Sequence, residues 1–182
     1  GVKIVISNTN SPHKLDAGKY NERVAECQTA VAAINSHRPL KNLGELGLKE
    51  FESLASFITD TTVRKRAHHV VSEIERTREA VGKLQQGNLV RFGELMFASH
   101  DSLRDDYEVT GIELDTLFNA AKKVNGVIGT RMTGGGFGGC TVSLVKDENV
   151  GEFKEKVGKE YQQLTGLLAE FYVAEIGDGS HK

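Results

Sequence analysis

The stretch Val127-Ile-Gly-Thr-Arg-Met-Thr-Gly-Gly-Gly-Phe-Gly-Gly-Cys-Thr-Val-Ser-Leu-Val145 places a dense glycine cluster between two short segments of alternating residues. Five of the twenty glycines of the chain lie in residues 134–139. Alternation with a period of two predicts β-strands over residues 127–132 and 140–145. The cluster allows positive φ angles or a close approach to another group, and its unhindered N–H groups suit an anionic phosphate. An ordinary flexible hairpin loop is the alternative, although such loops commonly need only one or two glycines.

The glycine spacing excludes three known phosphate-binding loops. Gly134, Gly136 and Gly139 satisfy G-x-G-x-x-G, but a strand pattern follows them where the dinucleotide-binding fingerprint requires a helix. No Lys-Ser or Lys-Thr pair follows the glycines, which excludes a Walker P-loop. No His-Arg-Asp or Asp-Phe-Gly follows them either, which excludes a protein kinase.

The composition restricts the class of protein further. The chain has 182 residues and a net charge of −2, with 23 Lys and Arg against 25 Asp and Glu, so we expect no attraction to nucleic acid or to an anionic membrane. Cys27 and Cys140 lack metal-ligand spacing, which suits a reducing compartment. No signal peptide is recognisable, and no apolar run approaches the ~20 residues that span a bilayer. We expect a cytoplasmic protein.

Periodicity in the rest of the chain predicts further elements. In chain order they are a strand from Val2, a turn over residues 8–18, helices starting near Tyr20 and covering residues 48–58, 63–84, 92–103 and 110–126, the two strands, a helix over residues 149–166 and a strand over residues 170–176. This order predicts an α+β fold, in which a four-stranded, mostly antiparallel sheet has helices stacked on one face.

Several local features make this prediction more specific. The third helix has an unbroken apolar seam that runs from Val63 to Leu84. Asn88 and Asn149 are expected to cap the helices that follow them, and Thr110 with Glu113 forms a capping-box pattern. The basic cluster Arg64-Lys65-Arg66, with His68-His69 after it, is expected to form a solvated helix face.

The start of the chain is also informative. It begins at Gly1 and enters a strand pattern at once, whereas a native N-terminus usually frays before its first element. We therefore expect the chain to be a C-terminal piece of a longer protein.

Residues 132–140 resemble the third conserved motif of the GHMP small-molecule kinases. Other segments are similar to the C-terminal half of the galactokinase family, namely residues 19–23, 102–110 and 113–115. The similarity runs in order from residue 1 to about residue 177. Galactokinases usually have Ala where this chain has Gly135, and the missing methyl adds backbone freedom.

This resemblance implies a GHMP kinase C-terminal domain over residues 1–182. It implies transfer of the γ-phosphoryl group of ATP, with Mg²⁺, to the anomeric hydroxyl of α-D-galactose, a reaction catalysed mostly by positioning and electrostatic stabilisation. In the family, the galactose-reading motif, the ATP-phosphate loop and the catalytic Asp lie in the N-terminal half, and none of these motifs occurs here. We therefore expect no catalytic residue and no metal ligand in this chain, and we expect its own N-terminal domain as a partner.

We expect two parts of the chain to contact the substrates. Tyr20 matches the family position whose phenol contacts the sugar, although a Tyr at a helix start is more often a surface or interface residue. The loop beside the phosphates consists of Thr133, Gly134, Gly135, Gly136, Phe137, Gly138 and Gly139. Within it, Phe137 is expected to pack and to hold the loop in place, because an all-glycine loop would lose much entropy on ordering.

Other reactive residue types have structural explanations. Asp105 and Asp106 could bind a metal, but carboxylates before a helix more commonly cap it. His68, His69, His100 and Ser99 form no recognisable nucleophile, base and orienting group. Cys140 is expected to point inward from its strand as a small buried hydrophobe.

Three other functions remain open. The chain could belong to a non-catalytic galactose sensor of the same fold, which the residues upstream of Gly1 would distinguish. It could belong to another GHMP kinase that acts on a different sugar or on an alcohol such as mevalonate or homoserine, although residues 19–23 and 104–109 favour galactokinase. A helical interaction module would explain the apolar seam but not the five glycines.

Overall fold

The computed structural model describes residues 1–11, 17–175 and 177. Its helices and strands follow the predicted order, with α2 continued by a 3₁₀ turn at Ala55–Phe57. They are β1 (Val2–Asn8), α1 (Ala17–Asn35), α2 (Leu48–Leu54), α3 (Thr61–Gln85), α4 (Leu89–Asp105), α5 (Ile112–Lys122), β2 (Val127–Thr133), β3 (Cys140–Lys146), α6 (Val150–Thr165) and β4 (Glu170–Ala174). Part of the predicted turn over residues 8–18 and the predicted end of the last strand at Ile176 lie outside the described residues.

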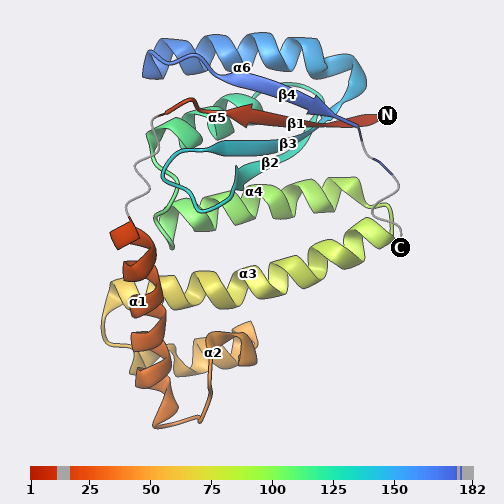
Figure 1. Ribbon diagram of the computed structural model, residues 1–182. Helices are drawn as coiled ribbons and strands as arrows, with labels where there is room; N and C mark the ends of the chain where they lie inside the picture. Colours follow the sequence, from red (N-terminus) through yellow and green to blue (C-terminus); the bar gives the residue numbers. More distant parts are fainter. Residues whose placement is uncertain (12–16, 176, 178–182) are drawn as a thin grey trace.

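The four strands form one sheet in the order β2-β3-β1-β4. All three pairings are antiparallel, so the predicted α+β fold with a four-stranded antiparallel sheet is confirmed (Figure 1). The register places Ser143 of β3 opposite Val5 of β1 and opposite Thr130 of β2. The hairpin that carries the glycine loop therefore joins an edge strand to an interior strand.

Helices α5 and α6 cover one face of this sheet. Val5 and Val145 pack there in one cluster with Leu117 of α5 and with Phe153 and Val157 of α6. In a pleated strand, the residues that alternate with Val145 at a spacing of two share its face. Thr141 and Ser143 therefore lie on the same face of β3 as Val145, and this polar side is the deeply buried one.

The prediction that Cys140 points inward is therefore wrong. Cys140 is half-buried, whereas its neighbour Thr141 and Ser143 are fully buried. The hydroxyl of Ser143 forms a 2.8 Å hydrogen bond with that of Thr130 across the β2–β3 pair, which offsets the cost of burying these two hydroxyls. Partial burial raises the pKa of the Cys140 thiol. A raised pKa disfavours the reactive thiolate, which agrees with the expectation of an unreactive thiol.

The remaining helices form a separate layer. Helix α4 runs beside β2, and α3 packs on α4 with α1 and α2 beyond it (Figure 1). The approach of α4 to β2 depends on two glycines, because a Cβ on Gly93 would lie 1.8 Å from the carbonyl oxygen of Ile128, and one on Gly129 would lie 2.6 Å from Gly93 Cα. This arrangement differs from the expected stack on one face of the sheet.

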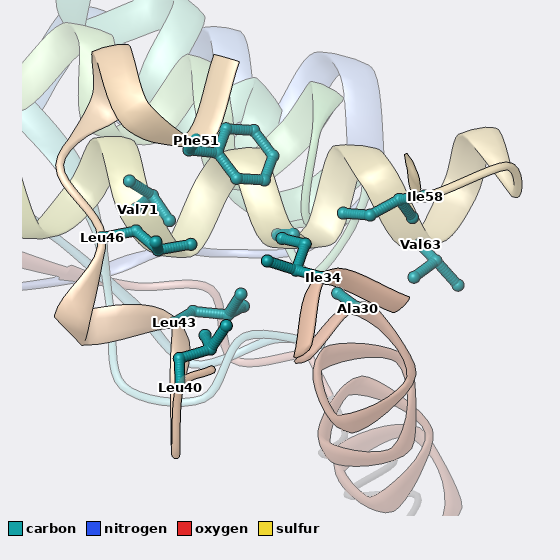
Figure 2. Close-up of a cluster of buried hydrophobic side chains, with 10 residues drawn as sticks. Ala30, Ile34, Leu40, Leu43, Leu46, Phe51, Ile58, Val63 and Val71 are labelled. Atoms are coloured by element: carbon teal, nitrogen blue, oxygen red, sulfur yellow. The ribbon is translucent and has the colours of Figure 1, made fainter. Parts of the chain in front are cut away.

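A second hydrophobic core holds the outer layer together. Figure 2 shows apolar side chains from α1, α2, α3 and the turns between them converging on one another. Its buried members are Ala30, Ile34, Leu40, Leu43, Leu46, Phe51, Ile58, Val63, Ala67 and Val71. The end of the α3 seam lies outside this core, since Val81 is 52% exposed and Leu84 is 47% exposed.

The predicted helix caps have different outcomes. The side chain of Asn88 accepts a hydrogen bond from Arg91 N at 3.0 Å and caps α4 as expected. The capping box of Thr110 and Glu113 is wrong, because α5 begins after Gly111, whose φ is +84° and which provides no side-chain cap. Asn149 precedes α6, but its side chain caps no backbone N–H.

Candidate functional site

The glycine loop has a left-handed backbone over most of its length. The φ angle is +84° at Gly134, +81° at Gly136, +107° at Gly138 and +89° at Gly139. Phe137 also has a positive φ, at +56°, which is uncommon for a residue with a side chain. These angles explain why glycines dominate the loop, and Gly135 is the one residue in 134–139 without a positive φ.

The rear of the loop is anchored to the protein. Phe137 N donates a hydrogen bond to Val109 O at 2.8 Å, and Thr9 N donates one to Gly139 O at 2.9 Å. A Cβ on Gly136 would lie only 2.0 Å from that same Val109 oxygen. Phe137 packs, as expected, against a cluster of Leu103, Val109, Leu114 and Met132. The rear is therefore a fixed structure and not a flexible hairpin tip.

The front of the loop is open. Thr133, Gly134 and Gly135 are exposed, and a Cβ on Gly134 or Gly135 would meet nothing within 4 Å. Among the described residues, the backbone N–H groups of Gly134 and Gly135 donate to no other group. The loop thus presents unhindered donors on a fixed support, as an anion-binding loop requires.

Tyr20 lies near the same end of the molecule. It belongs to the first turns of α1 and is 72% exposed. Arg23, one turn further along α1, donates from Nε to Tyr107 O at 2.8 Å, and Tyr107 is two residues before Val109. Figure 1 accordingly shows the start of α1 and the β2–β3 loop at one end of the fold. The contact of Tyr20 with a sugar stays a prediction.

A buried ion-pair network joins α1 and α3 to the segment behind the loop. Arg66 is 2% exposed and pairs with Glu26 Oε2 at 3.1 Å and with Glu108 Oε2 at 2.9 Å. Arg23 pairs with the same oxygen of Glu26 at 2.5 Å, and Arg66 also donates to Asp106 O at 2.6 Å. The hydrogen bond from Arg66 lowers the pKa of Glu108.

The prediction of a solvated basic face on α3 is therefore wrong for Arg66 and His69. Both are buried, whereas Lys65 is exposed. Arg66 follows Val63 by three positions and precedes Val70 by four, which places it on the apolar side of the helix. That spacing could have predicted the burial of Arg66 from the sequence. The carboxylates that pair with Arg66 make this burial possible.

His69 belongs to a second polar chain. Its Nδ1 lies 2.9 Å from Ser102 Oγ, and Ser102 donates to Asp106 Oδ2 at 2.9 Å. The imidazole stacks on Tyr107, and burial lowers the pKa of His69 to about 4. Because the serine proton points to the carboxylate and not to the imidazole, the three groups do not form a nucleophile with its base.

Asp105 and Asp106 do not cap α5, so that prediction is wrong. Asp105 is the last residue of α4 and pairs with Arg104 at 2.8 Å, whereas Asp106 is the C-cap residue of the same helix. No group of three or more His, Cys, Asp or Glu residues in the described part of the chain is arranged to hold a metal ion. Over those same residues, no helix is both long and apolar enough to cross a membrane.

Known proteins with similar sequences belong to the kinase family that the sequence motifs resemble. The profile of the family "GHMP kinases C terminal" matches residues 79–163. The galactokinase of Clostridium beijerinckii is 53% identical over 182 residues, and that of Fusobacterium nucleatum is 51% identical over 182 residues. In each case the match covers 100% of this chain and 47% of the relative.

Solved structures extend the comparison to the fold. The crystal structure of Lactococcus lactis galactokinase complexed with galactose superposes with a TM-score of 0.94 at 50% identity, covering 100% of this chain and 47% of that chain. A mevalonate kinase superposes with a TM-score of 0.52 at 19% identity, covering 94% of this chain and 39% of that chain. The second likeness concerns the fold alone.

The sheet, its helices and the glycine loop are those of a GHMP kinase C-terminal domain, and residues 79–163 match that family. Within it, the whole chain corresponds to the C-terminal half of the galactokinases. The chain spans about half the length of the curated relatives that it matches. The resemblance noted in the sequence is thereby confirmed.

Proposed function

We propose that the protein containing this chain is a galactokinase, which transfers the γ-phosphoryl group of ATP to the anomeric hydroxyl of α-D-galactose and forms galactose 1-phosphate. The observation that carries the proposal is the identity of 50% or more with galactokinases over the whole chain. The superposition on a galactokinase complexed with galactose supports it at the level of the fold. The enzyme would act in galactose metabolism in the cytoplasm.

Within this enzyme the chain would form one wall of the active-site cleft. The N–H groups of Gly134 and Gly135 would face the phosphates of ATP, while the anchored residues 136–139 hold that front in place. Tyr20 would contact the sugar from the same side. ATP supplies the transferred group, and Mg²⁺ neutralises the charge of its phosphates.

The chemistry itself would come from the N-terminal half of the enzyme, which is the expected partner of this domain. The Mg²⁺ ligands and the catalytic Asp would lie in that half, as the resemblance to the family implies. This division fits a reaction that depends on positioning and charge stabilisation by both walls of a cleft.

An ADP-release assay on the full-length protein tests the proposal. Galactose, glucose, mevalonate and homoserine are compared as acceptors at saturating ATP and Mg²⁺, with excess EDTA as the control. We expect turnover with galactose that EDTA abolishes. Binding of galactose and ATP without turnover would identify a sensor instead, and turnover with mevalonate or homoserine alone would identify another GHMP kinase.

A further inference from the structure

His100 is a fully buried histidine at the base of the glycine loop. It belongs to α4 and has no exposed surface. Its ring stacks on Phe118 of α5, with 3.8 Å between the ring centroids and 6° between the planes. Met132 N, in the residue directly before Thr133, donates to His100 Nδ1 at 3.0 Å, and His100 Nε2 lies 3.1 Å from Asp115 Oδ1.

These two partners define where the imidazole carries its proton. A backbone N–H only donates, so Nδ1 of His100 must be unprotonated to accept from Met132. The neutral ring then has its hydrogen on Nε2, which donates to the carboxylate of Asp115. The stack on Phe118 fixes the plane of the ring, so both hydrogen bonds keep their direction. Asp115, Phe118 and His100 thus form one unit, in which His100 and Phe118 are buried, and it ends at the residue directly before the loop.

This unit holds the strand that enters the front of the loop, where Arg131 Nε also donates to Met132 O at 3.0 Å, whereas the side chain of Phe137 packs at the rear. Two further anchors join main chain to main chain, from Phe137 to Val109 and from Thr9 to Gly139, and both hold the rear. The front, residues 133–135, is exposed and includes two glycines without side chains that could pack. Its position therefore depends on the anchored rear and on the end of β2 from which it starts, where Thr133 pairs with Cys140 and Met132 bonds to His100.

We propose that His100 is a positioning residue for phosphoryl transfer, which sets the place of residues 133–135 through the N–H of Met132. This inference rests on the proposed function, because it assumes that those residues face the phosphates of ATP. Asp115 acts one step further away by keeping the His100 ring in the required tautomer. A displacement of about 1 Å at such a support can lower a rate about a hundredfold, although His100 itself touches no substrate.

Two substitutions separate the two hydrogen bonds of the ring. In His100→Asn the side-chain oxygen lies where Nδ1 was, so Met132 keeps an acceptor while Asp115 loses its donor. In His100→Gln the amide reaches the position of Nε2, so Asp115 keeps a donor while Met132 loses its acceptor. Both variants lose the stack on Phe118 and should lose similar stability. His37→Gln, at an exposed histidine beyond α1, is the matched control.

The measurements are made on the full-length protein. They are the ATP dissociation constant by calorimetry, kcat and both KM values by ADP release, the thermal midpoint, and hydrogen exchange of the Met132 amide. We expect His100→Gln to weaken ATP binding or lower kcat by about tenfold or more, with the galactose KM within about twofold. The Met132 amide should exchange at least about tenfold faster in this variant. His100→Asn should stay within about threefold of the wild type in ATP binding and kcat.

Equal effects of Asn and Gln would overturn the proposal, and so would kinetic losses that simply follow the thermal midpoints. Unchanged exchange at Met132 in His100→Gln would also overturn it. If His100→Gln does not fold, Asp115→Ala replaces it, because Asp115 is partly exposed; ATP binding should weaken in that variant and recover in Asp115→Asn. A wild type that binds ATP but does not phosphorylate galactose would refute the proposed function alone, since ATP binding and exchange still decide the role of His100.

Discussion

At the scale of single residues, the loop contains two adjacent glycines with opposite requirements. Gly136 has a φ of +81° and would place a Cβ 2.0 Å from Val109 O, whereas Gly135 has no positive φ and open space around it. We expect Gly136→Ala to lower the free energy of unfolding by roughly 2 kcal/mol or more, because the left-handed backbone alone costs an L-residue about 1–2 kcal/mol. Thermal midpoints of the full-length protein measure this loss.

Gly135→Ala is the matched control for this prediction. It should leave the midpoint unchanged or raise it slightly, because alanine restricts the unfolded chain without strain in the folded one. Equal midpoints for the two variants would show that the loop does not rest against Val109.

Tyr20 allows a second test at this scale. Its side chain is 72% exposed, so Tyr20→Phe should leave the thermal midpoint unchanged. If the phenol contacts galactose, loss of one hydrogen bond of about 1 kcal/mol should raise the galactose KM about fivefold, with the ATP KM unchanged.

Tyr172→Phe provides the comparison for Tyr20. It removes the same hydroxyl from an exposed tyrosine on β4, where the hydroxyl donates to Glu170 at 2.9 Å. If the galactose KM is the same in both variants, the hydroxyl of Tyr20 does not contact galactose, and Tyr20 is an ordinary surface residue.

At the scale of elements, the packing of α4 on β2 depends on contact between two backbones. A Cβ on Gly93 would lie 1.8 Å from Ile128 O, so Gly93→Ala should force the helix away from the strand and cost roughly 1–3 kcal/mol. Gly82 in α3 has nothing within 4 Å of its Cβ position, and Gly82→Ala should stabilise by about 0.5–1 kcal/mol through helix propensity. Urea unfolding measures both, and effects of the same sign would contradict the close contact.

The contact between α3 and the end of α4 should also make stability depend on pH. Burial lowers the pKa of His69 to about 4 from 6.5, so the unfolded chain takes up a proton at this site before the folded protein does. The stabilisation is complete above pH 6.5 and falls as the pH drops from 6.5 towards 4.

His69→Gln removes this dependence. Between pH 7 and pH 5 the wild type should lose about 2 kcal/mol more than the variant, measured by urea unfolding at each pH. His37→Gln at an exposed histidine should keep the slope of the wild type. Parallel curves for the wild type and His69→Gln would show that the buried imidazole is not the titrating group.

At the scale of the whole molecule, the proposed function makes this chain one wall of a two-walled cleft. We expect the isolated 182-residue chain to show no galactose-dependent ADP release, because catalysis of this kind requires phosphates and acceptor to be held by both halves. The full-length protein assayed beside it is the positive control. Turnover by the chain alone at a comparable rate would contradict the division of labour proposed above.

Much of this molecule follows from local pattern. Alternation and glycine density predicted the β2–β3 hairpin and its loop, and periodicity predicted each helix, because hydrophobic spacing and backbone freedom are properties of neighbouring residues. The cap at Asn88 was predictable for the same reason. The family, too, was recognisable from motifs in the loop and around Tyr20.

What only the tertiary structure decided concerns partners that are distant in sequence. Alternation separates the two faces of β3, but contact with α5 and α6 determined that Thr141 and Ser143, and not Cys140, lie on the deeply buried face. Arg66 is charged and lies on a helix, yet carboxylates from two other segments allow its burial. The bond between His100 and Met132 spans 32 residues, and no local pattern contains it, because such contacts depend on how whole elements pack and not on the residues beside them.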